Sequence, residues 1–385
     1  AYEMLRSLVG SEMCIRDRSY IAPMSETIFK APRFAPRKGQ PFYQELTQRV
    51  NEYFQVEGIS KKGNARLYIK TAILVGGIIS TYLGLVLYAP SFSNAWILWL
   101  LMGILISGIG FNTMHDGAHG SFSKHNWLNE MAAHTVNFLG ASVLMWKTKH
   151  NTIHHTFTNI EGVDDDIEAG SLLRMAPGQK KLWIHKFQHV YFSALYALLY
   201  MYWIIFTDYK KYFTKKVGQV PLKPLTRFQH ISFWAWKALH LGLFVGLPMY
   251  NLGFFHWLAG FVLMSAIAGF VLSIVFQLAH VVDKTDFIAP SQNEPIETED
   301  EWAVHQLKTT ANFAMSNKFL TWFLGGLNYQ VEHHLFPRIS HVHYPSISKI
   351  VKETCEEFNI TYHEFKTFSS ALRSHVSHLK QMGIA

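Results

Sequence analysis

The stretch AWILWLLMGILISGIGFNTMHDGAH, at positions 95–119, joins a long apolar run directly to a pair of histidines. Residues 95–114 carry no charged side chain. At a rise of about 1.5 Å per residue, a helix of this length crosses most of the hydrocarbon core of a bilayer. If the helix continues, His115 and His119 at i and i+4 share one face. The stretch therefore predicts a membrane span that ends in two imidazoles.

Three further apolar runs extend this pattern. Residues 72–89 are also uncharged, and with 95–114 they predict a helical hairpin joined by the uncharged connection PSFSN. A second hairpin is predicted from residues 232–248 and 254–279, joined by MYNLG. The fold class is therefore an all-α integral membrane protein with four spans in two hairpins.

Residues 190–206 complicate the count of spans, because this run is nearly long enough to cross. Its tyrosines and tryptophan, and the flanking Lys186 and Lys210, favour a helix that lies at the membrane interface. The alternative is a fifth span. In that case everything after the second hairpin would lie on the opposite side of the membrane.

Composition agrees with a membrane enzyme that has water-facing parts. Of 385 residues, 49% are hydrophobic and 16% are charged, and the formal net charge is +8. The basic residues form no stripe interleaved with aromatics, so we expect no nucleic-acid partner and assign the charge to the membrane surface. Two cysteines, Cys14 and Cys355, give no disulfide framework and fit a reducing compartment.

Charge also predicts the orientation in the membrane. The segment before the first span is rich in lysine and arginine, and so is the long segment between the hairpins, whereas the hairpin turns are uncharged. By the positive-inside rule, both termini and the histidines lie on the cytosolic side.

The amino terminus divides into two parts. Residues 1–23 include LVGSEMCIRD, which resembles the translation of a sequencing adapter, and we expect a non-native leader with the native start at Met24. The alternative is a genuine tail. Residues 24–66 are then a basic cytosolic segment, and residues 67–385 a single domain.

Three histidine clusters follow the predicted spans rather than lying inside them. They are HDGAH at 115–119, HNTIHH at 150–155 and QVEHH at 330–334, and His280 ends the last apolar run. Imidazole binds iron, zinc or copper through one nitrogen while an acceptor orients the other. Clusters gathered on one membrane face predict a cytosolic helical cap that holds a histidine-rich site for two metal ions.

At these residues the chain resembles the membrane fatty-acid desaturase family. HDGAH, HNTIHH and QVEHH are similar to its three histidine boxes, and the glutamine that leads the third box is typical of front-end acyl desaturases. The segment EWAVHQLKTTANF, residues 301–313, also resembles one that precedes the third box in that family. The similarity covers about residues 42–343.

The resemblance implies a non-haem di-iron centre that uses O2 to remove two hydrogens from an acyl chain and so forms a cis double bond. Matched position by position, the implied ligands are His115, His119, His150, His154, His155, His333 and His334, with His280 as an additional ligand. Gln330 stands where a histidine is usual. It could ligate through its amide oxygen, hold a bound water, or leave a coordination position open.

The resemblance also implies a narrow apolar substrate slot and an outside source of electrons. Candidate wall residues are Trp146, Trp302 and Phe313. The acidic run at 164–166 offers acceptors to ligand histidines, contacts a cationic head group, or is a solvated loop. No His-Pro-Gly-Gly haem motif occurs, so we expect a separate carrier, of the ferredoxin or cytochrome b5 type, as in bacterial members, which places the protein in a bacterial inner membrane.

Several alternatives remain at this point. The acyl carrier is either coenzyme A or a membrane lipid. A hydroxylase, a conjugase or a sphingolipid desaturase would use nearly the same ligands. A non-catalytic membrane carrier of metal or haem belongs to another class, and it would place its histidines on facing spans or along a midplane path.

Overall fold

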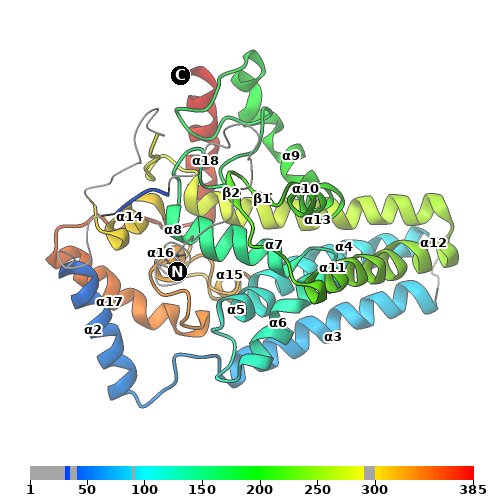
Figure 1. Ribbon diagram of the computed structural model, residues 1–385, viewed down its shortest axis with the longest axis horizontal. Helices are drawn as coiled ribbons and strands as arrows, with labels where there is room; N and C mark the ends of the chain where they lie inside the picture. The colour runs from blue at the N-terminus through cyan, green and yellow to red at the C-terminus, as the bar shows by residue number, and fades with distance from the viewer. Residues whose placement is uncertain (1–30, 35–40, 89–91, 290–299) are drawn as a thin grey trace, which may run out of the picture.

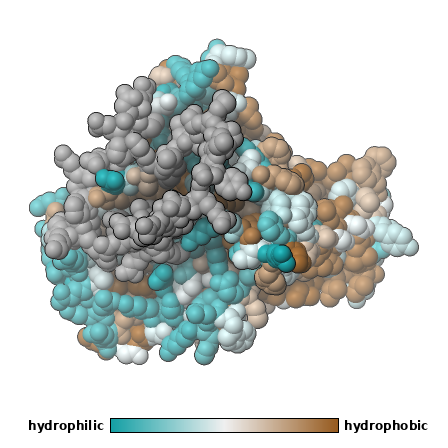
Figure 2. All heavy atoms as spheres, viewed as in Figure 1, coloured by the Kyte–Doolittle hydropathy of each residue, from teal (hydrophilic) through white to brown (hydrophobic). Residues whose placement is uncertain are grey.

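The computed structural model describes residues 31–34, 41–88, 92–289 and 300–385. A bundle of long helices extends from a broader cap of short helices (Figure 1). The bundle end is largely hydrophobic on its surface, whereas the cap carries more hydrophilic residues (Figure 2). The predictions on residues 1–23 lie outside the described residues.

Four helices in the described ranges are long and apolar enough to cross a membrane: Ala65–Leu87, Ala95–His119, Trp183–Thr214 and Phe254–His280. The expected all-α membrane fold with four candidate spans is therefore confirmed. α3 (Ala65–Leu87) begins where the side chain of Asn64 accepts a hydrogen bond from the backbone N–H of Arg66. α4 (Phe92–Ile109) continues through η2 (Gly110–Met114) into α5 (His115–His119), and η2 is a π-helical turn.

One of the four candidate spans is a different segment from the one predicted. Residues 190–206 lie within Trp183–Thr214, which comprises η4 (Trp183–Phe187), α9 (Gln188–Tyr202), η5 (Trp203–Thr207) and α10 (Asp208–Thr214). Residues 232–248 lie in α11 (Arg227–His240), η6 (Leu241–Gly246) and α12 (Leu247–Leu252), which are not among the four. Lys237 and His240 lower the hydropathy of that segment.

The course of the chain still favours α11 to α12 as the outward arm of the second hairpin. The side chain of Asn251 donates to the carbonyl of Val86 at the end of α3, 2.9 Å away. The chain then turns at Gly253 and returns along α13 (Phe254–His280), and α12 lies at the end of the bundle away from the cap (Figure 1). If this arm and α13 both cross the membrane and residues 190–206 do not, the first and third histidine boxes lie on the same side.

α9 instead packs between the cap and the later part of α13. The side chain of Gln188 donates to the carbonyl of Leu379 in α18 (Phe368–Ile384), and the Tyr196 hydroxyl lies 2.9 Å from a ring nitrogen of His375. A Cβ on Gly269 would lie 2.6 Å from the carbonyl oxygen of Ala197, so only glycine permits this crossing. These contacts place α9 against α13 and α18, and the interfacial placement of residues 190–206 stays a prediction.

The cap gathers elements from both ends of the described chain. Apolar side chains of α2 (Pro41–Val56) pack against α17 (Tyr344–Glu357). Arg49 of α2 also forms a two-bond ion pair with Glu357, at 2.8 and 2.6 Å. The remaining helices of the cap are α14 (Trp302–Thr309), α15 (Lys318–Phe323), α16 (Gln330–Leu335) and η7 (His341–His343).

Short helices and strands complete the cap and its margin. β3 (Asn312–Phe313) pairs in parallel with β4 (Glu364–Phe365), and β1 (Lys216–Val217) pairs antiparallel with β2 (Val220–Pro221). α6 (Asn126–Phe138) and α7 (Val143–Lys147) lead from the first histidine box to the second, which lies on η3 (Thr148–His154) and α8 (His155–Phe157). All three boxes thus lie where the cap meets the bundle.

Candidate metal centre

The first histidine box is held where α4 and its extension meet α6. α5 ends at Gly120, whose φ of 68° closes the helix in the left-handed conformation. A Cβ on Gly117 would lie 2.5 Å from the backbone nitrogen of Ala133 in α6, so the box can pack this closely only with glycine there. His115 and His119 are buried as a result.

Four histidines from all three boxes form the first of two groups that consist of histidines alone. One ring nitrogen from each of His115, His119, His150 and His333 lies within 4.8 Å of the others. The Nε2 atoms of His115 and His150 are 3.3 Å apart. These residues come from α5, η3 and α16, so the group exists only because three distant segments converge.

The second group joins the end of α13 to the second and third boxes. One ring nitrogen from each of His154, His280 and His334 lies within 4.8 Å of the others. The side-chain amide nitrogen of Gln330 lies 2.9 Å from Nε2 of His280 and 3.3 Å from Nε2 of His334. His155 lies between the two groups, with its ring centroid 4.5 Å from that of His333. All nine predicted ligand residues therefore meet at one place.

Helix geometry explains how neighbouring residues reach different groups. Successive side chains on a helix point about 100° apart, so His333 and His334 diverge, whereas Gln330 and His334 at i and i+4 share a face. His150 and His154 are also at i and i+4, yet only His150 belongs to the first group. The π-helical turn η3, which ends at His154, widens the helix at this box.

Several ring nitrogens in the cluster are buried without a hydrogen-bond partner. They are Nε2 of His119, His154 and His333, and Nδ1 of His155. Leaving so many buried polar atoms unsatisfied is costly in a protein interior, unless a ligand takes the lone pairs. Burial also holds the pKa of His155, His333 and His334 well below the ordinary value, so these rings are neutral. Buried neutral imidazoles with free lone pairs fit a metal ion.

Four of the rings are oriented by a partner at the opposite nitrogen. His154 Nδ1 lies 3.0 Å from a carboxylate oxygen of Asp164, and His334 Nδ1 lies 2.7 Å from the amide oxygen of Gln306. His333 Nδ1 lies 3.1 Å from the hydroxyl of Tyr344, and His280 Nδ1 lies 3.2 Å from the backbone carbonyl oxygen of residue 309. Such partners are typical of metal-binding histidines, because they fix the tautomer that leaves Nε2 free.

The acidic run at 164–166 takes part in this arrangement. Asp164 is fully buried, which rules out the solvated-loop alternative for this residue. Burial alone would lower the pKa of His154, but the charges of Asp164 and Asp166 outweigh it and raise that pKa. Asp166 also pairs with Lys149 at 2.9 Å. Among the three sequence alternatives, the geometry favours acceptors for ligand histidines.

Two acidic residues inside the boxes point away from the groups and tie the boxes to the cap. Asp116 accepts hydrogen bonds from the hydroxyl of Ser340, at 2.7 Å, and from Nδ1 of His341, at 3.0 Å. Glu332 accepts a hydrogen bond of 2.8 Å from the hydroxyl of Tyr362. Burial raises the pKa of Glu332 to about 7 although this hydrogen bond opposes the shift.

Sequence reasoning did not single out Gln306, Tyr344 or His341 as partners in this site. Gln306 lies in the segment 301–313 that resembled the family, so a signal for it existed. No spacing rule pairs Gln306 with His334, because the two lie on different helices, α14 and α16.

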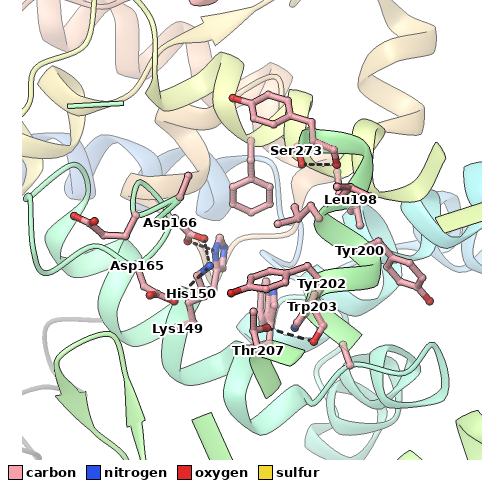
Figure 3. Close-up of a pocket in the computed structure, with 18 of the residues that line it drawn as sticks. Lys149, His150, Asp165, Asp166, Leu198, Tyr200, Tyr202, Trp203, Thr207 and Ser273 are labelled. Atoms are coloured by element: carbon pink, nitrogen blue, oxygen red, sulfur yellow. Dashed lines mark hydrogen bonds and ion pairs between the residues drawn. The ribbon is translucent and has the colours of Figure 1, made fainter. Parts of the chain in front are cut away.

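A cavity of about 690 Å³ adjoins the first group. Trp146, His115 and His150 line it, together with residues of α4, η2, α9 and α13. In Figure 3, Lys149, His150, Asp165 and Asp166 lie on one side of this cavity, and the labelled residues of α9 and η5 lie on the other.

The three predicted wall residues lie in different places. Trp146 lines the cavity and stacks on His150, with ring centroids 4.4 Å apart. The indole of Trp302 instead donates to the backbone carbonyl of His155, at 3.2 Å. Phe313 lies in β3 and contacts the ring of Phe368, with centroids 6.2 Å apart.

Fold and site together define a membrane protein with a buried, histidine-rich metal site at the end of its spanning helices. Residues 54–366 match the fatty acid desaturase family. The chain belongs to this family, in its front-end branch, and it is a fatty-acyl desaturase, an oxidoreductase.

Several named relatives are similar in sequence over most of this chain. The chain is 36% identical to the sn-1 linoleoyl-lipid 6-desaturase of Arthrospira platensis, over 89% of this chain and 93% of that protein. It is also 36% identical to the sn-1 linoleoyl-lipid 6-desaturase of Synechocystis sp., over 92% of this chain and 98% of the relative. Identity to an acyl-lipid (8-3)-desaturase of Physcomitrium patens is 34%, over 91% of this chain and 73% of that protein.

Proposed function

We propose that this protein is a di-iron acyl-lipid desaturase of the front-end type, which introduces a cis double bond into an acyl chain of a membrane lipid. The observation that carries the proposal is the convergence of three histidine boxes and His280 into two adjacent groups of ring nitrogens. The names of the relatives favour an acyl-lipid over an acyl-CoA substrate.

The site has ligands for two iron ions. The first would be held by His115, His119, His150 and His333, and the second by His154, His280 and His334, with His155 between them. Rotating the amide of Gln330 by 180° would present its oxygen to the second group, and we propose this oxygen or a water it holds as a further ligand. All-imidazole ligation also suits zinc and copper, so iron rests on the family and on the chemistry required.

The chemistry explains why a redox metal is needed. An alkyl C–H bond offers no polar handle to an acid or base, so bound iron would supply the oxidant from O2. The balanced reaction consumes O2, two electrons and two protons, and it converts CH2–CH2 into CH=CH with release of two waters.

The protein itself positions the acyl chain and the ligands. The cavity brings an apolar chain next to His115 and His150, and Trp146 packs on the ring of His150. Asp164 and Gln306 keep two ligand rings in the metal-binding tautomer.

We further propose the orientation in the membrane that the distribution of lysine and arginine predicts. Both termini and the histidine site face the cytosol, and a separate carrier of the ferredoxin or cytochrome b5 type delivers electrons there. Residues 67–385 act as one desaturase domain, and α2 joins it by packing on α17. A bacterial inner membrane is the proposed location.

Lipid analysis tests the function directly. The protein is expressed in a host with defined fatty acids, and derivatised acyl chains are located by gas chromatography and mass spectrometry. We expect new double bonds with the wild type and with His134→Ala, a partly exposed histidine of α6, and none with His333→Ala. Hydroxylated chains without new double bonds would contradict the proposal and favour a hydroxylase. A Soret band in the purified protein would favour a haem carrier.

A further inference from the structure

The cavity beside the histidine groups is lined by both apolar and charged side chains. Its inner walls are apolar and include Ile106, Phe111 and Met114 of α4 and η2. It is also lined by four lysines and by the acidic side chains of residues 165, 166 and 168, and Lys149, Asp165 and Asp166 lie on the side of His150 (Figure 3). An apolar channel with charged residues in its lining matches an amphipathic ligand.

The cavity also reaches the outer surface of α9. Leu172, Leu198, Leu199 and Tyr202 line it, and they are 51, 49, 41 and 51% exposed. We name these four residues the side opening. Apolar side chains exposed on a helix at the membrane margin face acyl chains more favourably than water. The side opening therefore gives a hydrocarbon chain a way in from the bilayer.

The charges in the lining do not cancel. Lys149 pairs with Asp166 at 2.9 Å, and Lys211 lies 3.4 Å from a carboxylate oxygen of Asp165. Lys210 and Lys216 also line the cavity, and within the described part of the chain neither forms an ion pair. Four lysines and three carboxylates thus leave one excess positive charge in the lining, and among the described residues the two lysines outside any ion pair are Lys210 and Lys216.

From these features the geometry points to a specific substrate: a membrane glycerophospholipid whose acyl chain enters through the side opening and whose phosphate is held by Lys210 and Lys216. This inference rests on the proposed function and adds the entry route and the head group. A soluble acyl-CoA would have no use for an apolar opening towards the bilayer, and a neutral glycolipid would have none for two unpaired cations.

The head-group assignment is tested with the full-length protein in nanodiscs, supplied with a reducing system. Three substrates carry the same acyl chain: phosphatidylglycerol, a neutral galactolipid and acyl-CoA. We expect phosphatidylglycerol to be converted fastest. The variant Lys210→Gln/Lys216→Gln should raise the half-saturating fraction of phosphatidylglycerol about fivefold per lysine, from roughly 1 kcal/mol per charge near a membrane surface.

A charge-matched control separates a local effect from a change in net charge. Lys124→Gln/Lys223→Gln removes two exposed lysines that do not line the cavity, and it should leave the phosphatidylglycerol response unchanged. Equal effects of the two double variants would overturn the head-group assignment, as would faster conversion of the galactolipid or of acyl-CoA by the wild type. Failure to convert any of the three substrates would instead contradict the proposed function.

The entry route has its own test. Leu199→Trp should block the side opening and lower the rate with phosphatidylglycerol severalfold. Ile205→Trp is the matched control, because Ile205 is 59% exposed on the adjoining η5 and does not line the cavity. Thermal unfolding of both variants shows whether each is folded, and iron content shows whether the metal site is intact. A folded, iron-loaded Leu199→Trp protein with the wild-type rate would overturn the side opening as the route.

Discussion

Replacing Gln306 by leucine should weaken iron binding at the second histidine group while leaving the fold in place. Gln306 is fully buried, and its amide oxygen lies 2.7 Å from Nδ1 of His334. The hydroxyl of Thr158 also lies 2.9 Å from that oxygen. Leucine has a similar size but no acceptor, so the N–H at Nδ1 of His334 would be left without its partner.

The expected magnitude follows from that lost bond. Leaving one buried donor unsatisfied costs about 1–3 kcal/mol. Removing the hydrogen-bond partner of a metal-binding histidine typically lowers metal affinity about 10- to 100-fold, which agrees with that range. Gln306→Glu restores the acceptor, and the other amide atom, Nε2, has no partner to lose. We therefore expect Gln306→Glu to retain iron.

The assay is iron per protein after titration with a competing chelator, measured together with thermal unfolding. Gln188→Leu is the matched control, because Gln188 is an equally buried glutamine whose side chain bonds the backbone of Arg174 and Leu379. It should lower the unfolding temperature without a selective loss of iron. Wild-type iron affinity in a folded Gln306→Leu protein, or equal iron loss in both variants, would refute the reasoning.

Three further predictions concern the first box, the acidic run and pH. Gly117→Ala should destabilise the protein by about 1–3 kcal/mol through overpacking against α6. The control Gly76→Ala, with open space at its Cβ, should leave thermal unfolding unchanged. Equal effects of the two variants would argue against the close crossing. Asp164→Asn should cost about 10-fold or more in iron affinity, and unchanged iron content under chelator competition would contradict the role of the carboxylate. Burial lowers the pKa of both His305 and His375 to about 4. Their contribution to stability is therefore present above the unfolded pKa of about 6.5 and is lost as pH falls towards 4. The loss is about 1.4 kcal/mol per pH unit for each group. The double variant His305→Gln/His375→Gln should flatten the dependence of the unfolding temperature on pH, and a slope equal to that of the wild type would count against this assignment.

Local sequence predicts the helices of the bundle well, because the bilayer leaves few choices. An uncharged run such as residues 95–114 must satisfy its backbone hydrogen bonds internally, and helix length is set by membrane thickness. By length and hydropathy, the same rule selects the segment Trp183–Thr214 and leaves out α11 to α12. The choice depends on which segment reaches the turn at Gly253, and the packing of Asn251 on Val86 favours α11 to α12.

By itself, the sequence determined the helical membrane class, the family and the residue types able to hold a metal, because helix period and imidazole chemistry are local properties. Only the tertiary structure decided that His115 and His333 share one group while His280 joins another. It alone paired His334 with Gln306 and opened the cavity on the side of α9. These contacts join residues far apart in the chain, and their positions are fixed by helix packing, which no periodicity in the sequence records.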